Sequence, residues 1–238
     1  HPLLKVIDKY LAEGKLGKVL EIGGRGKGDR RGGDEDLWVL GSHVLNLVHY
    51  FGGAPRNCSA RMFKNGKPVT AADVKEGNEG LGPLASNELH ARYEMERGFI
   101  AYFDSIANDT TQNHGFGLHI IGSKGFIAIR NDRHPLAHLV PGNPFGPTAQ
   151  SRPWIPFNTP GPGKDEPDMK VIDDLVHHVT AAKDLVVAIR EDREPLCNVH
   201  EGAMTVEMIC GVFESHRQGG KAVAIPLKER GNALAKLK

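Results

Sequence analysis

Residues 32–53, GGDEDLWVLGSHVLNLVHYFGG, form the stretch on which the interpretation of the chain depends. Their apolar side chains recur every three or four positions, which predicts an amphipathic helix with one stripe facing a core. That stripe consists of Leu37, Leu40, Val44, Leu47, Val48 and Phe51. Asp36 can accept hydrogen bonds from the first free backbone N–H groups, and the glycine pair at 52–53 ends the helix.

A second stripe of the same helix interrupts the apolar pattern with polar residues. It consists of Val39, His43, Asn46 and Tyr50. The pattern leaves two interpretations of His43 open. It is either a core histidine with satisfied ring nitrogens in an ordinary docked helix, or a functional group on a pocket wall.

The composition is that of a soluble globular protein. The 238 residues include 30 Lys and Arg against 29 Asp and Glu, which leaves a net charge of +1. A near-neutral chain is a poor candidate for binding nucleic acid or an anionic membrane surface. No apolar run approaches the roughly 18 residues of a membrane-spanning helix. We therefore expect neither a nucleic acid nor a membrane as partner.

The cysteines indicate the compartment. Cys58, Cys197 and Cys210 form no CxxC motif, and their number is odd. This usage predicts reduced core residues in a non-oxidising compartment, and therefore a cytoplasmic protein. The chain starts at His1 without a methionine or an apolar signal region, so we expect that an upstream segment was removed. A removed export signal stays open.

Periodicity predicts helices, then a run of strands, then helices again, which is typical of one α+β domain. Besides the central helix, the predicted helices cover 2–13, 171–190 and 201–217. The predicted strands cover 18–24, 56–64, 88–96, 99–106, 116–121, 126–130, 134–140 and 222–225. Short turns between successive strands imply an antiparallel meander with one covered face. The tail from Lys228 is expected to fray.

Two segments interrupt this pattern. Residues 65–86 are polar and are interpreted as an insertion with a short helical segment at 70–75. Residues 141–170 form a loop whose proline-rich part, 141–163, is expected to exclude regular ladder pairing. Its aromatic side chains, which pack either on the sheet or on another subunit, are Trp154 and Phe157.

The loop at 24–33, GRGKGDRRGG, could cradle an anion. The dinucleotide fingerprint GxGxxG fails here, because Gly24 and Gly26 fit but the third position is Asp29 and no helix begins at once. An RGG-type nucleic-acid segment would be longer and carry aromatics, so a loop that helps to form a small-molecule pocket fits better. Unless the loop is simply solvated, the side chains that could contact hydroxyl or anionic groups are Arg25, Lys27, Asp29 and Arg31.

Residue spacings predict neither a metal site nor a nucleophile–histidine–aspartate triad. His134 and His138 are four apart, but a proline between them disfavours the helix that would present both. His200 and Glu201 start an HExxH-like sequence in which Met204 replaces the second histidine. The GxSxG nucleophile elbow does not occur.

Five stretches, taken in order, carry a family resemblance. They are GKLGKVLEI (14–22), GG (32–33), LGSHVLNLVHYFGG (40–53), GLHIIGSKGFIAI (117–129) and REPLCNVHEGAMTVEMICGVFESHRQGGKAVAIPL (193–227). Together they resemble the carboxy-terminal domain of the Gfo/Idh/MocA oxidoreductases, a family that includes glucose–fructose oxidoreductase and inositol dehydrogenase. The resemblance implies an α+β fold with an open, mostly antiparallel sheet and helices packed on one face, similar to the carboxy-terminal domain of glyceraldehyde-3-phosphate dehydrogenase.

The family joins this domain to an amino-terminal Rossmann domain, which binds NAD(P) and supplies a lysine in a Glu-Lys-Pro motif. Neither the glycine fingerprint nor Glu-Lys-Pro occurs in this chain. The resemblance therefore implies that residues 1–238 are a single substrate-binding and dimerisation domain that lacks the nucleotide-binding domain. We expect this fragment to bind no cofactor and to be inactive alone, whereas the full-length protein uses NAD or NADP.

The resemblance also assigns site residues. His43 matches the histidine that ends the family's DxxxH motif, where it can serve as catalytic acid or base or hold a substrate hydroxyl. Two family aspartates fall on Val39 and Asn46, neither of which can act as a base. Either another carboxylate compensates, or the chemistry is altered or absent; the carboxylates close in sequence are Glu35, Asp36 and Asp29. The expected substrate-binding residues are Asn46, Tyr50, Arg25, Lys27, Asp29, Arg31 and Asp36.

These assignments point to an NAD(P)-dependent oxidoreductase acting on a sugar, cyclitol or related polyol. The resemblance further implies a homodimer or tetramer that assembles through the open sheet face. Two alternatives stay open. One is a non-catalytic sugar-binding or scaffolding relative, and the other is redox-neutral glycoside hydrolysis that uses NAD.

Overall fold

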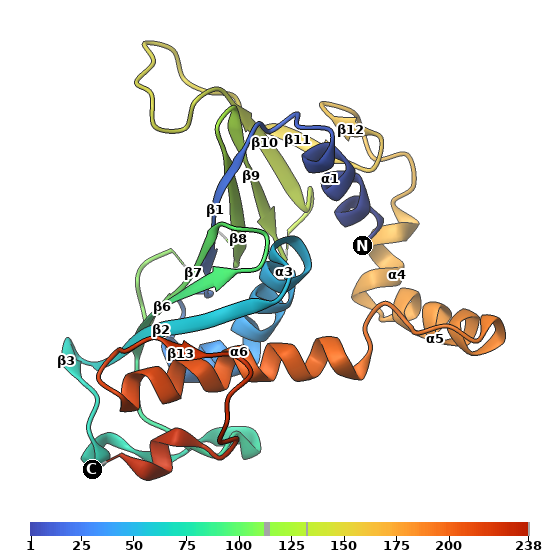
Figure 1. Cartoon of the computed structure of the whole chain (residues 1–238). Helices are drawn as coiled ribbons and strands as arrows, with labels where there is room; N and C mark the ends of the chain where they lie inside the picture. The colour runs from blue at the N-terminus through green and yellow to red at the C-terminus, as the bar shows by residue number, and fades with distance from the viewer. Residues whose placement is uncertain (112–114, 132, 238) are drawn as a thin grey trace.

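The computed structural model describes residues 1–111, 115–131 and 133–237. An 11-stranded sheet dominates this part of the chain (Figure 1). Its strand order is β12-β11-β10-β9-β8-β1-β7-β6-β2-β13, with β3 paired to β2. The strands are β1 (Val19–Arg25), β2 (Pro55–Lys64), β3 (Lys67–Pro68), β6 (Glu88–Met95), β7 (Ile100–Ile106), β8 (Gly117–Gly122), β9 (Gly125–Arg130), β10 (Ala137–Pro141), β11 (Ile155–Asn158), β12 (Gly161–Pro162) and β13 (Val223–Ala224).

The sheet is antiparallel except at one place. β1 runs parallel to β7 on one side and antiparallel to β8 on the other. Along β6, the side chains of Leu89, Ala91 and Tyr93 are buried, whereas His90 and Arg92 between them point to the other face. One face of the sheet is therefore covered, and the opposite face is called the open face below. The predicted α+β fold with a mostly antiparallel sheet is confirmed.

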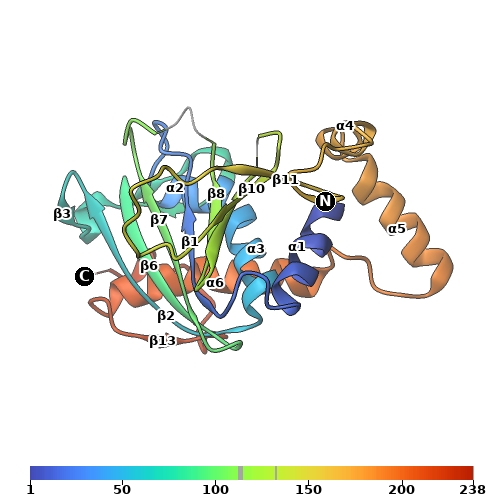
Figure 2. The same ribbon diagram turned by 90° about the horizontal axis from the view of Figure 1, so that it is seen from above.

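Helices cover the buried face of the sheet (Figure 2). α3 (Ser42–Gly52) packs against β1, β7 and β8, and α6 (Val199–Arg217) packs against β2 and α3. The phenol of Tyr93 donates to the backbone carbonyl of Met208 at 3.1 Å, which ties the sheet to α6. The first helix, α1 (Pro2–Ala12), buries Leu3 and Ile7 against the same core.

The insertion at 65–86 contains only short elements. A single 3₁₀ turn, η2 (Ala71–Asp73), confirms the short helical segment predicted there. The remaining elements are the paired strands β4 (Lys75–Glu76) and β5 (Pro83–Leu84) and the turn η3 (Asn78–Gly80).

The proline-rich segment differs from its prediction. It contains β11, which pairs with β10, so the expectation that prolines exclude a ladder was wrong at 155–158. Pro156 is tolerated because this strand lies near the end of the sheet. Phe157 enters the core, and Trp154 packs on side chains of the open face.

The predicted helix at 171–190 is two helices. α4 (Lys170–Val176) and α5 (Val179–Glu191) are separated at His178, whose φ of 60° lies in the left-handed region. The sequence pattern of this segment predicts an apolar face that consists of Ile172, Leu175, Val179, Ala182, Val186 and Ile189. That face is not buried in this chain, since Val186 is 46% and Ile189 is 72% exposed. The apolar periodicity of residues 171–190 therefore predicted helical structure correctly but predicted the burial of its apolar face wrongly.

Two smaller expectations were also wrong. The tail does not simply fray, because η5 (Ala233–Lys236) buries Ala233 and Leu234 against the core. Cys197 is exposed rather than a core residue, whereas Cys58 is buried, which raises the pKa of its thiol to about 12. No helix among the described residues combines the length and apolarity needed to cross a membrane.

Candidate functional site

His43 lies in the first turn of α3, and its side chain is exposed. Its ring centroid is 6.4 Å from that of Phe116, which precedes β8. The interpretation of His43 as a satisfied core histidine is therefore wrong. A residue of that kind is His216, which is buried, accepts from the backbone N–H of Met62 and contacts the carbonyl of Val69, both at 3.1 Å.

The helix that carries His43 begins earlier than predicted and has an irregular turn. α2 (Asp34–Asp36) continues into the π-helical turn η1 (Leu37–Gly41), which leads into α3. A Cβ on Gly41 would meet the ring of Phe103 at 2.7 Å, so this glycine lets the helix lie directly on β7. π-helical turns inside helices are frequent at functional sites. Here the turn directly precedes α3, and His43 is the second residue of that helix.

The other members of the polar stripe lie further along α3. Asn46 donates to the hydroxyl of Thr205 at 3.2 Å, which joins α3 to α6. Tyr50 is 39% exposed and lies about 10 Å beyond His43 along the helix, given a rise of about 1.5 Å per residue. Burial and the carboxylate of Asp8 raise the pKa of Tyr50. The stripe therefore spans one helix, with His43 at its exposed start.

A neighbouring contact between the two helices was not predicted. His49 Nδ1 lies 2.8 Å from Glu201 Oε2, one turn before Thr205 on α6. Nothing in the sequence marks this pair, because the two residues are 152 positions apart. Together with the Asn46 contact, it fixes the start of α6 against the helix that carries His43.

The charged loop at 24–33 is held by one ion pair within it and one to Asp109. Arg25 pairs with Asp109, and Asp29 accepts from the guanidinium and the backbone N–H of Arg31, both at 2.9 Å. The guanidinium of Arg31 lowers the pKa of Asp29. Three of the four expected substrate contacts, Arg25, Asp29 and Arg31, thus also form ion pairs, while Lys27 uses its backbone N–H to donate to Asp36 at 3.2 Å.

The buried side chain of Asp36 holds this loop against β7 by hydrogen bonds. Its side chain is 0% exposed, and its Oδ2 accepts from the hydroxyl of Ser105 at 2.6 Å and from the backbone N–H of Lys27. A Cβ on Gly26 would lie 1.7 Å from that oxygen, so the loop approaches because residue 26 has no side chain. Asp36 does not cap the helix as predicted, because it lies inside it. It supports the loop surface rather than forming part of it.

Asp34 is a second buried carboxylate, which the sequence analysis missed. It accepts from the backbone N–H groups of Ala85 and Ser86 at 2.6 and 3.0 Å, while its own backbone N–H donates to the Ser86 hydroxyl at 3.0 Å. These bonds fix the helix start to the end of the insertion. An acidic residue directly after the glycine pair 32–33 was the available signal, but its partners lie 51 and 52 positions away.

The start of the helix that carries His43 lacks the free backbone N–H groups of a pyrophosphate site. At the helix start, the backbone N–H groups of Gly33 and Asp34 already donate to the hydroxyls of Ser105 and Ser86. The side chains of Asp34 and Asp36 in this first turn are buried and already hydrogen-bonded to the protein. Within the described part of the chain, no group of three His, Cys, Asp or Glu side chains could hold a metal ion.

Asp36→Asn tests whether burial keeps this carboxyl protonated. Burial raises the pKa of Asp36, so the folded chain keeps a proton that the unfolded chain releases as the pH rises past 3.8. The free energy of unfolding should therefore fall with rising pH between that value and the raised pKa, by up to about 1.4 kcal/mol per pH unit. Asp36→Asn should make this fall smaller, while Asp34, whose pKa burial also raises, keeps its own contribution, as measured by urea unfolding between about pH 4 and pH 8.

Asp29→Asn is the matched control, because the pKa of Asp29 is lowered and its contribution has the opposite sign. That contribution is present above the ordinary carboxyl pKa and is lost as the pH falls through the lowered one. Equal pH slopes for the unmodified chain and Asp36→Asn would contradict a protonated Asp36.

Comparison with known proteins places the fold. No family model and no curated protein sequence matches the chain. A levoglucosan dehydrogenase in complex with NADH and L-sorbose superposes with a TM-score of 0.65 at 17% identity, over 94% of this chain and 64% of its own. An NAD binding oxidoreductase from Klebsiella pneumoniae gives 0.65 at 14% identity, over 96% and 64%. The WlbA dehydrogenase from Bordetella pertussis, in complex with NADH and UDP-GlcNAcA, gives 0.58 at 13%, over 96% and 61%.

The likeness covers nearly the whole of this chain but less than two thirds of these neighbours. At such identities it shows a shared fold. The neighbours are oxidoreductases that bind NAD, so the fold is one that such enzymes use for a large part of their length.

Proposed function

We propose that this chain is the substrate-binding half of a Gfo/Idh/MocA-type, NAD(P)-dependent oxidoreductase that acts on a sugar, cyclitol or related polyol. The observation that carries the proposal is His43, an exposed imidazole on a helix packed directly on the sheet. The shared fold supports it, since two of the neighbours were solved with NADH and a sugar or sugar nucleotide. The nucleotide-binding domain lies outside residues 1–238 in this proposal.

His43 provides the acid–base function of the site. A neutral imidazole accepts a proton from a substrate hydroxyl and returns it in the reverse reaction. Asn46 and Tyr50 extend the pocket wall along α3, and Arg25, Lys27, Asp29 and Arg31 provide polar groups on the adjoining loop. Asp36 acts through that loop. Val39 carries no carboxylate, so His43 works without the aspartate four residues before it.

The test is turnover by the complete protein, with NAD and NADP each offered against a panel of sugars, cyclitols and other polyols. We expect reduction of one nicotinamide, seen as its near-ultraviolet absorbance, with a subset of substrates. The chain 1–238 alone should show none. No absorbance change with any substrate would contradict the proposal.

A non-catalytic sugar-binding relative is the second candidate, favoured by the two replaced aspartates at Val39 and Asn46. It predicts that a sugar raises the melting temperature of the complete protein without any change in nicotinamide absorbance. Redox-neutral glycoside hydrolysis would instead release a sugar from a glycoside while NAD stays unchanged in amount.

We also propose that two copies associate through the open face. Trp154 is 48% exposed and lies on the rings of His119, Phe126 and His138, at centroid distances of 6.3, 5.4 and 6.2 Å. A partly exposed tryptophan on a platform of rings is a typical centre of a protein interface. Arg92 and Glu94 on β6 lie on the same face and give it charges of both signs.

Trp154→Ala should weaken this association about 10- to 30-fold, since a central tryptophan often contributes about 2 kcal/mol. Sedimentation equilibrium of the unmodified chain and the variant measures the dissociation constant. Phe145→Ala, at a 68% exposed aromatic of the same loop, is the control and should leave it unchanged. A monomer at all concentrations would contradict the proposal, and an equal effect of both variants would assign the contact to the loop instead of the sheet.

A further inference from the structure

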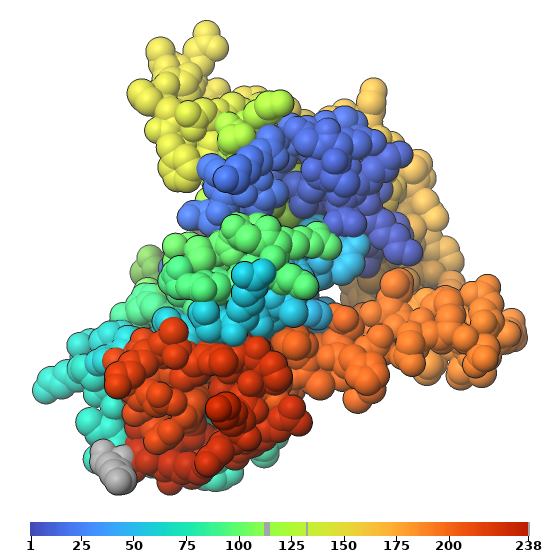
Figure 3. Space-filling model, in the orientation of Figure 1, coloured from blue at the N-terminus to red at the C-terminus, as the bar shows by residue number. Residues whose placement is uncertain are grey.

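Large apolar side chains are exposed along one projecting part of the molecule. Residues 170–198, called the arm below, comprise α4, α5 and the loop to α6, and they stand away from the body in Figures 1 and 3. Most of the exposed large apolar residues of the described chain lie on the arm or directly next to it. They are Met169, Val176, Leu185, Val186, Val187, Ile189, Leu196, Val199 and Val206.

Apolar side chains that stay in contact with water contribute no hydrophobic stabilisation to the helix pair α4 and α5. Ile189 is 72%, Leu196 62% and Leu185 50% exposed. Monomeric soluble proteins rarely leave a contiguous apolar surface of this kind in water. Within α5, Ala188 is the buried residue, although the helix has the apolar periodicity of one that packs on a core. The face that the sequence predicts to be buried therefore lacks its partner in residues 1–238.

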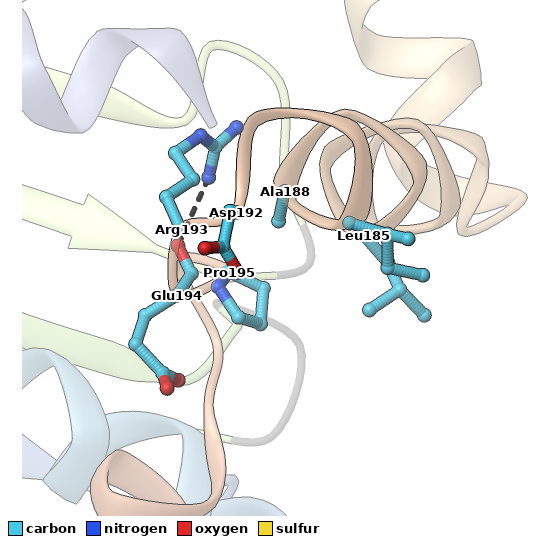
Figure 4. A pocket seen from close by; sticks show the side chains of 7 residues that line it. Leu185, Ala188, Asp192, Arg193, Glu194 and Pro195 are labelled. Atoms are coloured by element: carbon cyan, nitrogen blue, oxygen red, sulfur yellow. Dashed lines mark hydrogen bonds between the residues drawn. The ribbon is translucent and has the colours of Figure 1, made fainter.

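The exposed face of α5 has a hollow at its carboxy-terminal end (Figure 4). It has a volume of about 440 Å³ and is lined by Leu185, Ala188 and Ile189 from the helix and by residues 192–195 from the loop. Because its walls are partly apolar and it opens to the surface, it can receive an apolar side chain from a docking partner.

Arg193, the cation in the lining of this hollow, forms two ion pairs. Arg193 donates to Asp184 at 2.8 Å and to Glu191 at 3.0 Å. Asp184 also accepts from the backbone N–H of Leu196 at 2.7 Å, so the loop is fixed to the helix. The surface thus offers a partner a preformed hollow with a net negative rim, because Arg193 stands against the carboxylates of the loop and of Asp184.

The structural neighbours extend well beyond the part that matches this chain. They match 94–96% of this chain, which is too much to leave out the arm, yet only 61–64% of their own length. More than a third of each neighbour therefore has no counterpart here. The amino-terminal end of α1 lies beside α4 in both views of the ribbon, and Lys5 of α1 interacts electrostatically with Asp184 of α5 (Figures 1 and 2).

We infer that the arm is the docking surface for a nucleotide-binding domain. Leu185, Val186 and Ile189 are its apolar contacts, and the hollow at the end of α5 receives a side chain of that domain. This inference rests on the proposed function, because that function requires such a domain. A docked domain would cover the exposed face of α5 and hold α4 and α5 in place relative to α3. The arm would then couple nucleotide binding to the helix that carries His43, since residues 192–198 join α5 to α6, and α6 contacts α3 through Thr205 and Glu201.

Hydrogen exchange tests the inference without any substitution. Peptides covering 179–191 are compared by mass spectrometry between the chain 1–238 and the protein encoded by the complete gene. We expect these amides to exchange at least about tenfold more slowly in the complete protein, at any protein concentration. Equal exchange in both would overturn the inference. Protection that appears in 1–238 alone and grows with its concentration would also overturn it, because a second copy would then cover the arm.

Ile189→Asp in the complete protein should remove this protection and leave the affinity for NADH, measured by its fluorescence, within about threefold. Phe145→Asp is the control, since it makes the same kind of change at an exposed residue of another loop. If the arm is protected but no NAD(P)-linked turnover is found, the docking inference stands and the proposed function is wrong. If turnover is found but the arm is not protected, the proposed function stands and the docking inference is wrong.

Discussion

His43→Ala in the complete protein is expected to lower kcat with its best polyol substrate by about 10²–10⁴-fold, the range of a lost general acid or base. The reason is geometric. Among the residues proposed for the site, His43 is the exposed imidazole at the start of α3, and Val39 and Asn46 offer no carboxylate that could take its place. Steady-state kinetics at saturating cofactor measures the effect, and KM should change much less than kcat because the proton is transferred in the transition state.

The control for this substitution is His134→Ala, which removes another exposed histidine, located between β9 and β10. It should leave kcat within about twofold. The affinity for NADH should be unchanged in both variants, since the proposal places the nucleotide site in a domain outside residues 1–238. Full activity in His43→Ala would remove His43 from the acid–base role and favour a site in which the histidine only holds a hydroxyl group.

The sheet was predictable because its strands obey a local rule. Alternating residues such as 88–96 and 99–106, bounded by turn signals, define strands whatever their partners are. The parallel insertion of β1 between β7 and β8 carries no local signal, because strands 18–24 and 99–106 are distant in sequence. The break at His178 also had none, since neither proline nor glycine marks it.

The sequence predicted where the candidate site lies, but not the buried side chains that hold its helix and loop in place. His43 and the loop at 24–33 follow from one stretch of sequence and its resemblance. The buried carboxylates Asp34 and Asp36 do not, because their partners Ser86 and Ser105 lie 52 and 69 positions away. Periodicity treats an acidic residue in a first helical turn as exposed, whereas here two such residues are enclosed by chain from the insertion and from β7.

Gly32→Ala is expected to destabilise the fold by about 4 kcal/mol or more, which few single substitutions reach. A Cβ at this position would lie 2.0 Å from the backbone nitrogen of Ala107 and 2.2 Å from its Cα. Neither atom can rotate away, so the backbone itself would have to move. The movement would break the bonds from Gly33 and Asp34 to Ser105 and Ser86, which position the helix of His43. Urea unfolding followed by circular dichroism measures the loss.

Gly202→Ala separates this clash from the general effect of replacing a glycine. Gly202 lies in α6, and a Cβ there would meet nothing within 4 Å, so alanine should stabilise the chain by about 0.5–1 kcal/mol. Opposite signs for the two variants are the expected result. A Gly32→Ala variant within about 1 kcal/mol of the unmodified chain would show that the loop can open at residue 107, and the rigid support inferred for His43 would then be wrong.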